Sequence, residues 1–500
     1  MQKIADTPLS NFLRICVTAL LLILSACGES DGGSGSGSGS GSDGGSSGGS
    51  GDGSNNGGGS GGDPNPPAIR FFAADDGVNG HELWKTDGTA GGTIMVKDIN
   101  PGGADSSPSR FIELDGASYF IADDGVHGKE LWKTDGTADG TVLVKDISPP
   151  TVPYVPNNFT VFNDLLYFTA DDGVNGIELW KTDGTTAGTV LVKDINPTGH
   201  SFGFNARHLT IFKGQLYFGA DDGIQGAGLW KTDGTSAGTV LVTPIKTVYQ
   251  GTSSPNNFVV NNGLLFFQAG DSVYENSSVL WKSDGTAAGT VIVKKFKPPR
   301  AGRQVLTRFT VFGDDLYLIT DNGYVGSELW KTDGTQAGTV LVKEINYTPG
   351  ISFNPMDLAV FNNAIYFSAD DGVNGQALWK TDGTPAGTVV VKAIPGTSFE
   401  SRGYTALKRR LYFNATEGVN GNELWKSDGT DTGTVLVKDI NPAAGASSNA
   451  SGLFILNDTL YFQADDGVNG MELWTTDGTA DGTLLVKDVC PGSCSGRLAY

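Results

Sequence analysis

The sequence predicts an all-β fold, a β-propeller of about nine four-stranded blades, and three observations support this. All nine tryptophans are followed three residues later by the aspartate of an xDGTxxGT string. The tryptophans are 46–51 residues apart, which gives units of about 49 residues. Each unit holds four short β-prone runs and no helical period. A four-stranded sheet repeated at this length is typical of propellers. A β-solenoid is the alternative, but its repeats are usually shorter and have fewer strands.

The unit that begins at Phe159 shows how each strand is predicted. Two apolar runs flank Asn163-Asp164, a dipeptide typical of tight turns. A polar loop, DDGVNG, separates the second run from the third. The DGTTAG segment then turns the chain into a fourth run, rich in β-branched residues. The four predicted strands are 159–162, 165–170, 178–182 and 190–195.

The two ends of the repeat region predict how the ring closes. The first unit begins at Ile69, which aligns with the second strand of other units, so it has no first strand. The last unit ends its fourth strand at Val489, and Arg497–Tyr500 then resembles the start of a first strand. We therefore expect the C-terminal strand to complete the first blade and close the ring, which would cover two open sheet edges. The propeller domain is predicted to span 68–500.

The repeated motif residues are predicted to be structural. An aspartate at the start of a turn accepts hydrogen bonds from the following backbone N–H groups, and glycine adopts positive φ at little cost. One tryptophan per unit suits a large filler between neighbouring blades. A ladder of sugar-binding tryptophans is the less favoured alternative. Lys193 and seven equivalents follow the fourth run and are predicted to protect the exposed outer edge.

The recurring motif resembles that of the bacterial ELWxxDGT-repeat proteins, and the resemblance covers about residues 68–490. The motif departs from this pattern where Gly228, Val279 and Ala377 replace the glutamate. The resemblance implies a secreted or surface-displayed, propeller-like repeat domain. It implies no particular activity.

The N-terminal segment is predicted to be an export signal and a tether. Residues 1–26 form a lipoprotein signal peptide, because a short apolar run ends in Leu-Ser-Ala-Cys, which resembles the bacterial lipobox. Cys27 is then the lipidated residue; an ordinary secretory signal is the alternative. Gly28 after the cysteine indicates the outer membrane, with a periplasmic or surface-facing domain. Residues 27–67, rich in Gly and Ser, are predicted to be a disordered, flexible tether.

The charge and the histidine content of the chain limit the classes of partner and of site that we expect. The formal net charge is -21, which argues against nucleic acid, because a cationic surplus is needed to release phosphate counterions. The four histidines occupy no fixed repeat position, which disfavours a histidine-based catalytic site. The sequence therefore predicts a protein that is not an enzyme.

Paired aspartates mark the loops between the second and third strands. Closely spaced carboxylates with glycine and asparagine suit Ca²⁺, but the spacing is not that of an EF-hand. Hydrogen-bonded turns are the favoured alternative, and no other cofactor is expected. The candidate calcium ligands are Asp75, Asp76, Asp123, Asp124, Asp171, Asp172, Asp465 and Asp466.

The long loops after the fourth strands vary most, and variable loops on a rigid scaffold commonly carry recognition. Their aromatic residues are candidates for stacking on sugars or anchoring a protein, and the alternative is that they pack within their own loops. The candidates are Tyr154, Phe204, Tyr249, Phe353 and Tyr404. Cys490 and Cys494 are predicted to form a disulfide near the ring closure, since an exported protein meets an oxidising compartment.

These observations favour a lipid-anchored envelope propeller that binds an unknown protein or polysaccharide. An enzyme acting on glycans and a purely structural envelope protein are the alternatives, because propellers host many functions.

Overall fold

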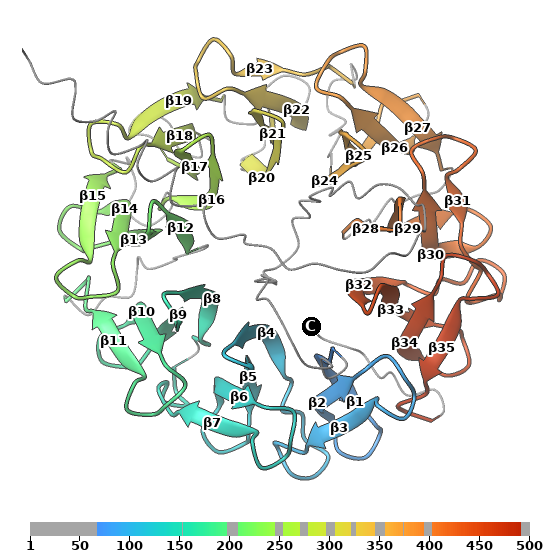
Figure 1. Cartoon of the computed structure of the whole chain (residues 1–500), viewed down its shortest axis with the longest axis horizontal. Helices are drawn as coiled ribbons and strands as arrows, with labels where there is room; N and C mark the ends of the chain where they lie inside the picture. Colours follow the sequence, from blue (N-terminus) through green and yellow to red (C-terminus); the bar gives the residue numbers. More distant parts are fainter. Residues whose placement is uncertain are drawn as a thin grey trace, which may run out of the picture. The chain divides into compact units, whose positions relative to one another are not determined.

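Nine antiparallel sheets form a ring in the computed structural model (Figure 1). The structure describes residues 68–491, apart from 153, 198–208, 246–253, 271–278, 297–305, 322–326, 346–355, 374 and 395–402. All regular elements among these residues are strands. The nine-bladed all-β propeller predicted from the sequence is thus confirmed. The predicted signal peptide and tether lie outside the described residues.

Each blade runs outward from the centre of the ring in chain order (Figure 1). Blades are numbered along the chain, and their strands are called inner, second, third and outer. The inner strands are β4 (Ser109–Leu114), β8 (Asn157–Phe162), β12 (Thr210–Phe212), β16 (Asn256–Asn261), β20 (Leu306–Phe312), β24 (Met356–Phe361), β28 (Thr405–Leu407) and β32 (Ser451–Leu456). The second strands are β1 (Arg70–Asp75), β5 (Ala117–Asp123), β9 (Leu165–Asp171), β13 (Gln215–Asp221), β17 (Leu264–Ala269), β21 (Asp315–Asp321), β25 (Ala364–Asp370), β29 (Arg410–Glu417) and β33 (Thr459–Asp465).

The outer half of each blade is a hairpin of the third and outer strands. The third strands are β2 (His81–Thr86), β6 (Lys129–Thr134), β10 (Ile177–Thr182), β14 (Ala227–Thr232), β18 (Val279–Ser283), β22 (Ser327–Thr332), β26 (Gln376–Thr381), β30 (Gly421–Ser427) and β34 (Met471–Thr476). The outer strands are β3 (Ile94–Lys97), β7 (Val142–Lys145), β11 (Val190–Lys193), β15 (Val240–Pro244), β19 (Val291–Lys295), β23 (Val340–Leu341), β27 (Val389–Ala393), β31 (Val435–Leu436) and β35 (Leu484–Lys487).

The first blade differs from the rest at its inner edge. Its sheet is three-stranded over the described residues, in the order β1-β2-β3, as the sequence offset predicts. The predicted closing strand, Arg497–Tyr500, lies outside the described residues. Among the described residues, side chains connect the two ends of the ring: Phe72 and Trp84 of blade one pack with Leu473 and Val489 of blade nine.

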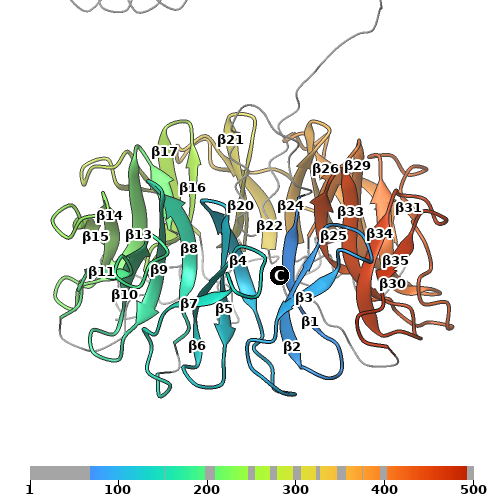
Figure 2. The same cartoon turned by 60° about the horizontal axis from the view of Figure 1, so that its bottom comes forward.

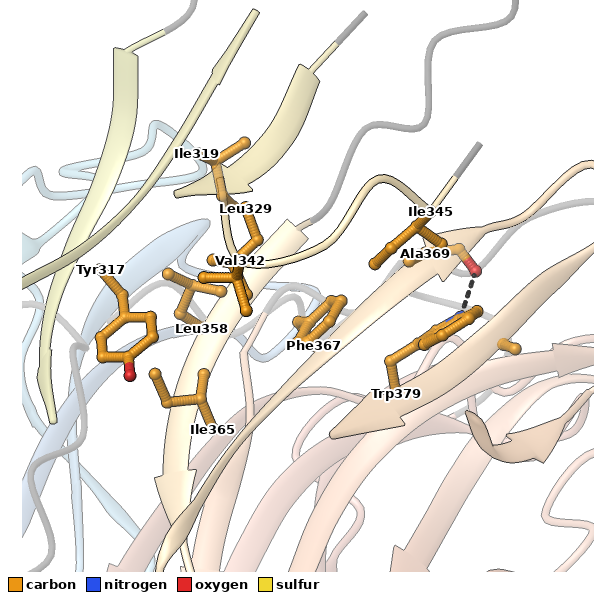
Figure 3. Packing of buried hydrophobic residues seen from close by; sticks show 11 residues of the cluster. Tyr317, Ile319, Leu329, Val342, Ile345, Leu358, Ile365, Phe367, Ala369 and Trp379 are labelled. Atoms are coloured by element: carbon orange, nitrogen blue, oxygen red, sulfur yellow. Dashed lines mark hydrogen bonds between the residues drawn. The ribbon is translucent and has the colours of Figure 1, made fainter. Parts of the chain in front are cut away.

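The tryptophans fill the space between blades, as predicted. Seven of the nine are only 5–7% exposed. In Figure 3, Trp379 of blade seven lies in a cluster that includes Tyr317 and Leu329 of blade six. Its ring stacks on Phe367, with centroids 6.4 Å apart, and its indole N–H donates to the Ala369 carbonyl at 3.2 Å. Burial of such a large flat side chain is a major contribution to blade packing.

The DGT turns have the same hydrogen bonds in all nine blades. In blade one, Asp87 Oδ1 accepts from the Thr89 N–H at 2.9 Å and from the Thr89 hydroxyl at 2.7 Å. The Thr86 and Thr93 hydroxyls meet at 2.8 Å and join the two strands that flank the turn. Gly88 has φ +94°, a conformation that favours glycine. The structural role predicted for this motif is confirmed.

The lysines after the fourth run each reach sideways to the next blade, and their protection of an open edge stays a prediction. Lys193 Nζ donates at 2.8 Å to the carbonyl of Thr239, the residue that ends the DGT turn of blade four. The same Nζ lies 6.0 Å from the centre of the Trp230 ring. Lys487 repeats this contact from blade nine to the Thr93 carbonyl of blade one at 2.6 Å. The turn therefore also links neighbouring blades.

Candidate binding face

Where the structure describes them, the loops between second and third strands lie at the same rim of the ring as the loops that leave the outer strands. We call this rim the loop face; the DGT turns lie at the opposite rim (Figure 2). In blade eight a backbone hydrogen bond connects the two kinds of loop, from the Gly445 N–H to the Val419 carbonyl at 3.2 Å. In blade one the Ser106 N–H donates to the carbonyl of His81, the first residue of β2, at 3.1 Å. The predicted grouping on one face is confirmed for the loops that the structure describes.

A buried glutamate from each ELW motif anchors the loop that follows the outer strand. Glu82 is fully buried, and its carboxylate accepts from the Ile99 N–H at 2.7 Å and the Ser106 hydroxyl at 2.6 Å. Glu423 repeats this with the Ile440 N–H at 3.2 Å and the Ser448 hydroxyl at 2.6 Å. The carboxylate satisfies backbone donors that the outer strand leaves unpaired as it ends.

Where the glutamate is replaced, the outer strand is longer. Gly228, Val279 and Ala377 occupy this position, and each forms an additional pair with the outer strand: Gly228 with Pro244, Val279 with Lys295, and Ala377 with Ala393. In blade three, where Glu178 is present, the pairing ends one residue earlier, at Leu179 with Lys193. One side chain therefore decides whether the chain leaves the sheet or continues along it.

Burial changes the acidity of these glutamates. Loss of solvent raises the pKa of Glu178 to about 8, and raises the pKa of Glu130, Glu423 and Glu472 to about 7, although backbone hydrogen bonds partly oppose the effect. The neighbouring carboxylate of Asp194 adds to the rise at Glu178. These groups exchange protons near neutral pH.

The paired aspartates serve the turns in which they lie. In blade three, Asp172 Oδ1 accepts from the Val174 N–H at 2.9 Å and the Asn175 N–H at 2.7 Å, and Oδ2 accepts from the Asn175 amide at 2.7 Å. Asp171 Oδ1 accepts from the Gly173 N–H at 2.8 Å. Partial burial would raise the pKa of Asp172, but the hydrogen bonds outweigh it and lower the pKa. The carboxylate therefore stays ionised at neutral pH.

The same turn geometry recurs at Asp75, Asp76, Asp123, Asp124, Asp465 and Asp466. Over the part of the chain that the structure describes, no three His, Cys, Asp or Glu residues are grouped so as to hold a metal ion. The geometry fits the hydrogen-bonded turns weighed against calcium, and calcium binding stays a prediction.

Two of the five candidate aromatic residues are described, and both pack against their own blade. The Tyr154 hydroxyl lies 2.8 Å from the Thr169 hydroxyl, and the Tyr404 ring lies 5.7 Å from the ring of Phe413. Both side chains are half-buried, which leaves little of either ring for a ligand. The other three candidates, Phe204, Tyr249 and Phe353, lie outside the described residues.

The described cysteine, Cys490, is fully buried and disulfide-bonded. Its backbone N–H donates to Glu472 at 3.2 Å. Its predicted partner Cys494, and the predicted lipidation site Cys27, fall on residues that the structure does not describe.

Sequence reasoning overlooked two features of the loop face. The first is the anchoring glutamate, although its three replacements coincide with altered residues after the outer strand. The second is an aliphatic residue at the tip of each DDGVNG-type loop, of which Val174 is 79% exposed. Its repetition was visible in the sequence, but its exposure was not.

Comparison with known proteins finds only distant similarities. No protein family and no curated protein matches the chain. Among solved structures, the computationally designed Ika8 protein is 13% identical over 74% of this chain and 97% of that one, with a TM-score of 0.43. Puromycin hydrolase is 13% identical, with a TM-score of 0.37, over 73% of this chain and 59% of the hydrolase. A structure described as one of two prolyl endopeptidases is 13% identical, with a TM-score of 0.38, over 72% of this chain and 53% of that one. Similarities this low carry no functional argument.

No helix long and apolar enough to cross a membrane occurs among the described residues.

Proposed function

We propose that the protein is an exported, lipid-anchored propeller of the bacterial outer membrane that binds a protein or polysaccharide through its loop face. One observation carries this proposal: the repeated motif is used by the scaffold. All nine DGT aspartates accept hydrogen bonds from the threonine of their own turn. The described parts of the loops that differ between units lie on the opposite rim. A constant frame with one divergent face is typical of recognition proteins.

The described histidines fit this proposal better than a catalytic role. His81 Nδ1 lies 3.2 Å from Asp105, and His127 Nδ1 lies 2.7 Å from Asp124 in the same loop. Each pair belongs to the local loop structure, and the two pairs come from different blades. Catalysis would require a nucleophile or substrate-facing acid beside such a pair.

Binding and catalysis are separated by two assays on the same mature protein. A glycan array and a panel of immobilised envelope proteins test binding, while release of reducing ends from the same glycans tests hydrolysis. Selective binding without turnover is expected. Turnover of any bound glycan would establish the enzymatic alternative.

The anchor is tested separately, by labelling cells with a radioactive fatty acid. We expect the wild-type chain to be labelled and to fractionate with the outer membrane. Cys27→Ser should abolish the label. A labelled variant, or an unlabelled wild-type chain, would contradict the lipid anchor.

A further inference from the structure

The loop face carries a ring of exposed aliphatic side chains. Seven blades each present one at the tip of the loop between the second and third strands, at 71–87% exposure. We call this set the aliphatic rim; it consists of Val78, Val126, Val174, Ile224, Val373, Val419 and Val468. They are the most exposed large hydrophobic residues in the described parts of the chain. The next most exposed is Leu484, at 54%.

The turn itself does not require these side chains. Val174 contributes its backbone N–H to Asp172, and any residue other than proline supplies that donor. Its neighbours change between blades: the residue after it is Asn175 in blade three but His127 in blade two and Gln225 in blade four. The tip residue is Val or Ile in these seven loops, whereas Tyr324 occupies the equivalent sequence position in blade six. Turn tips normally favour polar residues, so a retained and exposed aliphatic group is unusual there.

Carboxylates surround the rim. In six of its seven loops two consecutive aspartates precede the tip. Hydrogen bonds outweigh burial and lower the pKa of Asp76, Asp124, Asp172 and Asp466, so these groups are ionised at neutral pH. The whole chain is also acidic, with a net charge of -21. The rim therefore combines apolar tips with a fixed negative field.

The apolar tips and the negative charge together indicate which kind of partner fits the aliphatic rim. A second copy of the chain or an anionic lipid surface would bring negative charge against negative charge. A polysaccharide normally stacks on flat aromatic faces, whereas the rim is aliphatic, and the described loop tyrosines, Tyr154 and Tyr404, pack against their own blade. A basic polypeptide that also carries apolar side chains satisfies both properties of the rim.

We infer that the aliphatic rim docks a cationic polypeptide with interspersed apolar residues, which contacts several blades at once. This inference rests on the proposed binding function and specifies its partner. A single valine offers little apolar area, so affinity must come from repeated contacts around the ring. Binding should therefore fall steeply as rim residues are removed.

The test uses the full mature chain and three synthetic 20-residue peptides, which alternate Lys with Leu, Lys with Ser, or Glu with Leu. Fluorescence anisotropy at physiological salt should show binding of the Lys–Leu peptide, at least tenfold weaker binding of the Lys–Ser peptide, and none of the Glu–Leu peptide. The triple variant Val126→Ser, Val174→Ser, Val468→Ser should lose at least tenfold in affinity for the Lys–Leu peptide.

A matched control carries the same change at valines on the outer strands. Val142, Val190 and Val340 are 38–41% exposed and lie away from the rim. Their triple Ser variant should bind the Lys–Leu peptide as wild type does, and thermal melting should show that both variants are folded. Equal binding of the Lys–Ser peptide, or an unaffected rim variant, would overturn the inference.

The remaining outcomes separate the inference from the proposed function. Self-association or vesicle binding that is lost in the rim variant would assign the rim to a second copy or to lipid, and would overturn the inference. If the glycan array or protein panel shows a ligand whose binding the rim variant retains, the proposed function stands and the inference falls. If no probe of either kind binds, both fall.

Discussion

Two repeated carboxylates, in the DGT and ELW motifs, show how surroundings decide the role of the same chemical group. Asp87 lies at the surface, where the Thr89 hydroxyl and N–H lower its pKa. Glu82 is buried, and the loss of solvent raises its pKa despite three hydrogen bonds. The first holds a turn, and the second holds a loop. Both carboxylates therefore have a structural role.

Adjacent glycines in blade one test the DGT turn. A Cβ at Gly92 would fall on the Asp87 carboxylate, whereas a Cβ at Gly91 meets nothing within 4 Å. Gly92→Ala should therefore destabilise the protein by about 1–3 kcal/mol, because a packed turn must shift. Gly91→Ala is the control and should change stability by less than about 0.5 kcal/mol. Urea midpoints measure both; equal midpoints would contradict the turn geometry.

The buried glutamates predict that stability falls as pH rises. Their ordinary pKa of 4.5 applies to the unfolded chain, and in the folded protein it is raised to about 7 for Glu472 and about 8 for Glu178. Between these values the folded state holds more protons, so stability decreases with pH until it levels off above about pH 8. The melting temperature should be higher at about pH 5.5 than at about pH 8.5.

The matched variants for this prediction are Glu178→Gln and Glu113→Gln. The first removes a buried titrating group and should make the decline shallower. The second removes an exposed carboxylate on β4 and should leave the slope as in wild type. A melting temperature that is the same at the two pH values would contradict the prediction that the folded state holds more protons than the unfolded chain.

The binding candidates show the limit of sequence reasoning at the residue scale. The aspartate pairs could be placed in turns, because turn chemistry is local. The packing of Tyr154 against Thr169 and of Tyr404 against Phe413 depends on side-chain direction, so it could not be predicted from composition. The exposure of the rim valines likewise appears only once the loop is folded.

At the scale of elements, neighbouring blades share one connecting device, the outer-strand lysine. Lys145 of blade two donates to the Thr189 carbonyl of blade three at 2.8 Å, and Lys438 of blade eight to the Thr483 carbonyl of blade nine at 2.8 Å. Strand pairing could be predicted from the period within one unit. The lysine contact could not, because it depends on which turn of the next blade lies beside the strand.

Blade four has no lysine at this position, so the contact can be tested in two ways: by removing the lysine of blade three and by adding one to blade four. Lys193→Met should lower stability by about 1 kcal/mol, since a charge-assisted hydrogen bond to the Thr239 carbonyl is lost while the side-chain stem is kept. Thr243 pairs with Leu229 as Lys193 pairs with Leu179, so Thr243→Lys should place an amine toward blade five and raise the melting temperature. Thermal melting of both variants measures the effect. No loss from the first change and no gain from the second would refute the link.

At the scale of the whole molecule, the ring is nearly the same at every interface. The number and type of blades could be predicted because the same pattern occurs nine times. At the contact between blades nine and one, Lys487 lies 5.7 Å from the centre of the Trp84 ring, as Lys193 lies over Trp230 between blades three and four. The Tyr461 hydroxyl donates to the Gly88 carbonyl at 3.3 Å, whereas between blades one and two the equivalent Gly136 carbonyl accepts from Lys85. Side chains therefore contribute to joining the two ends of the ring.

The last prediction concerns the inner edge of blade one. The described residues of blade one form three strands where every other blade has four, and the closing strand expected from Arg497–Tyr500 would supply the fourth. Removing 497–500 should lower the melting temperature by several degrees and speed hydrogen exchange of the β1 amides, because backbone hydrogen bonds would be lost. Removing 28–67 from the tether is the control and should change neither. If the truncated chain melts and exchanges as wild type does, the side-chain contacts between blades nine and one close the ring unaided.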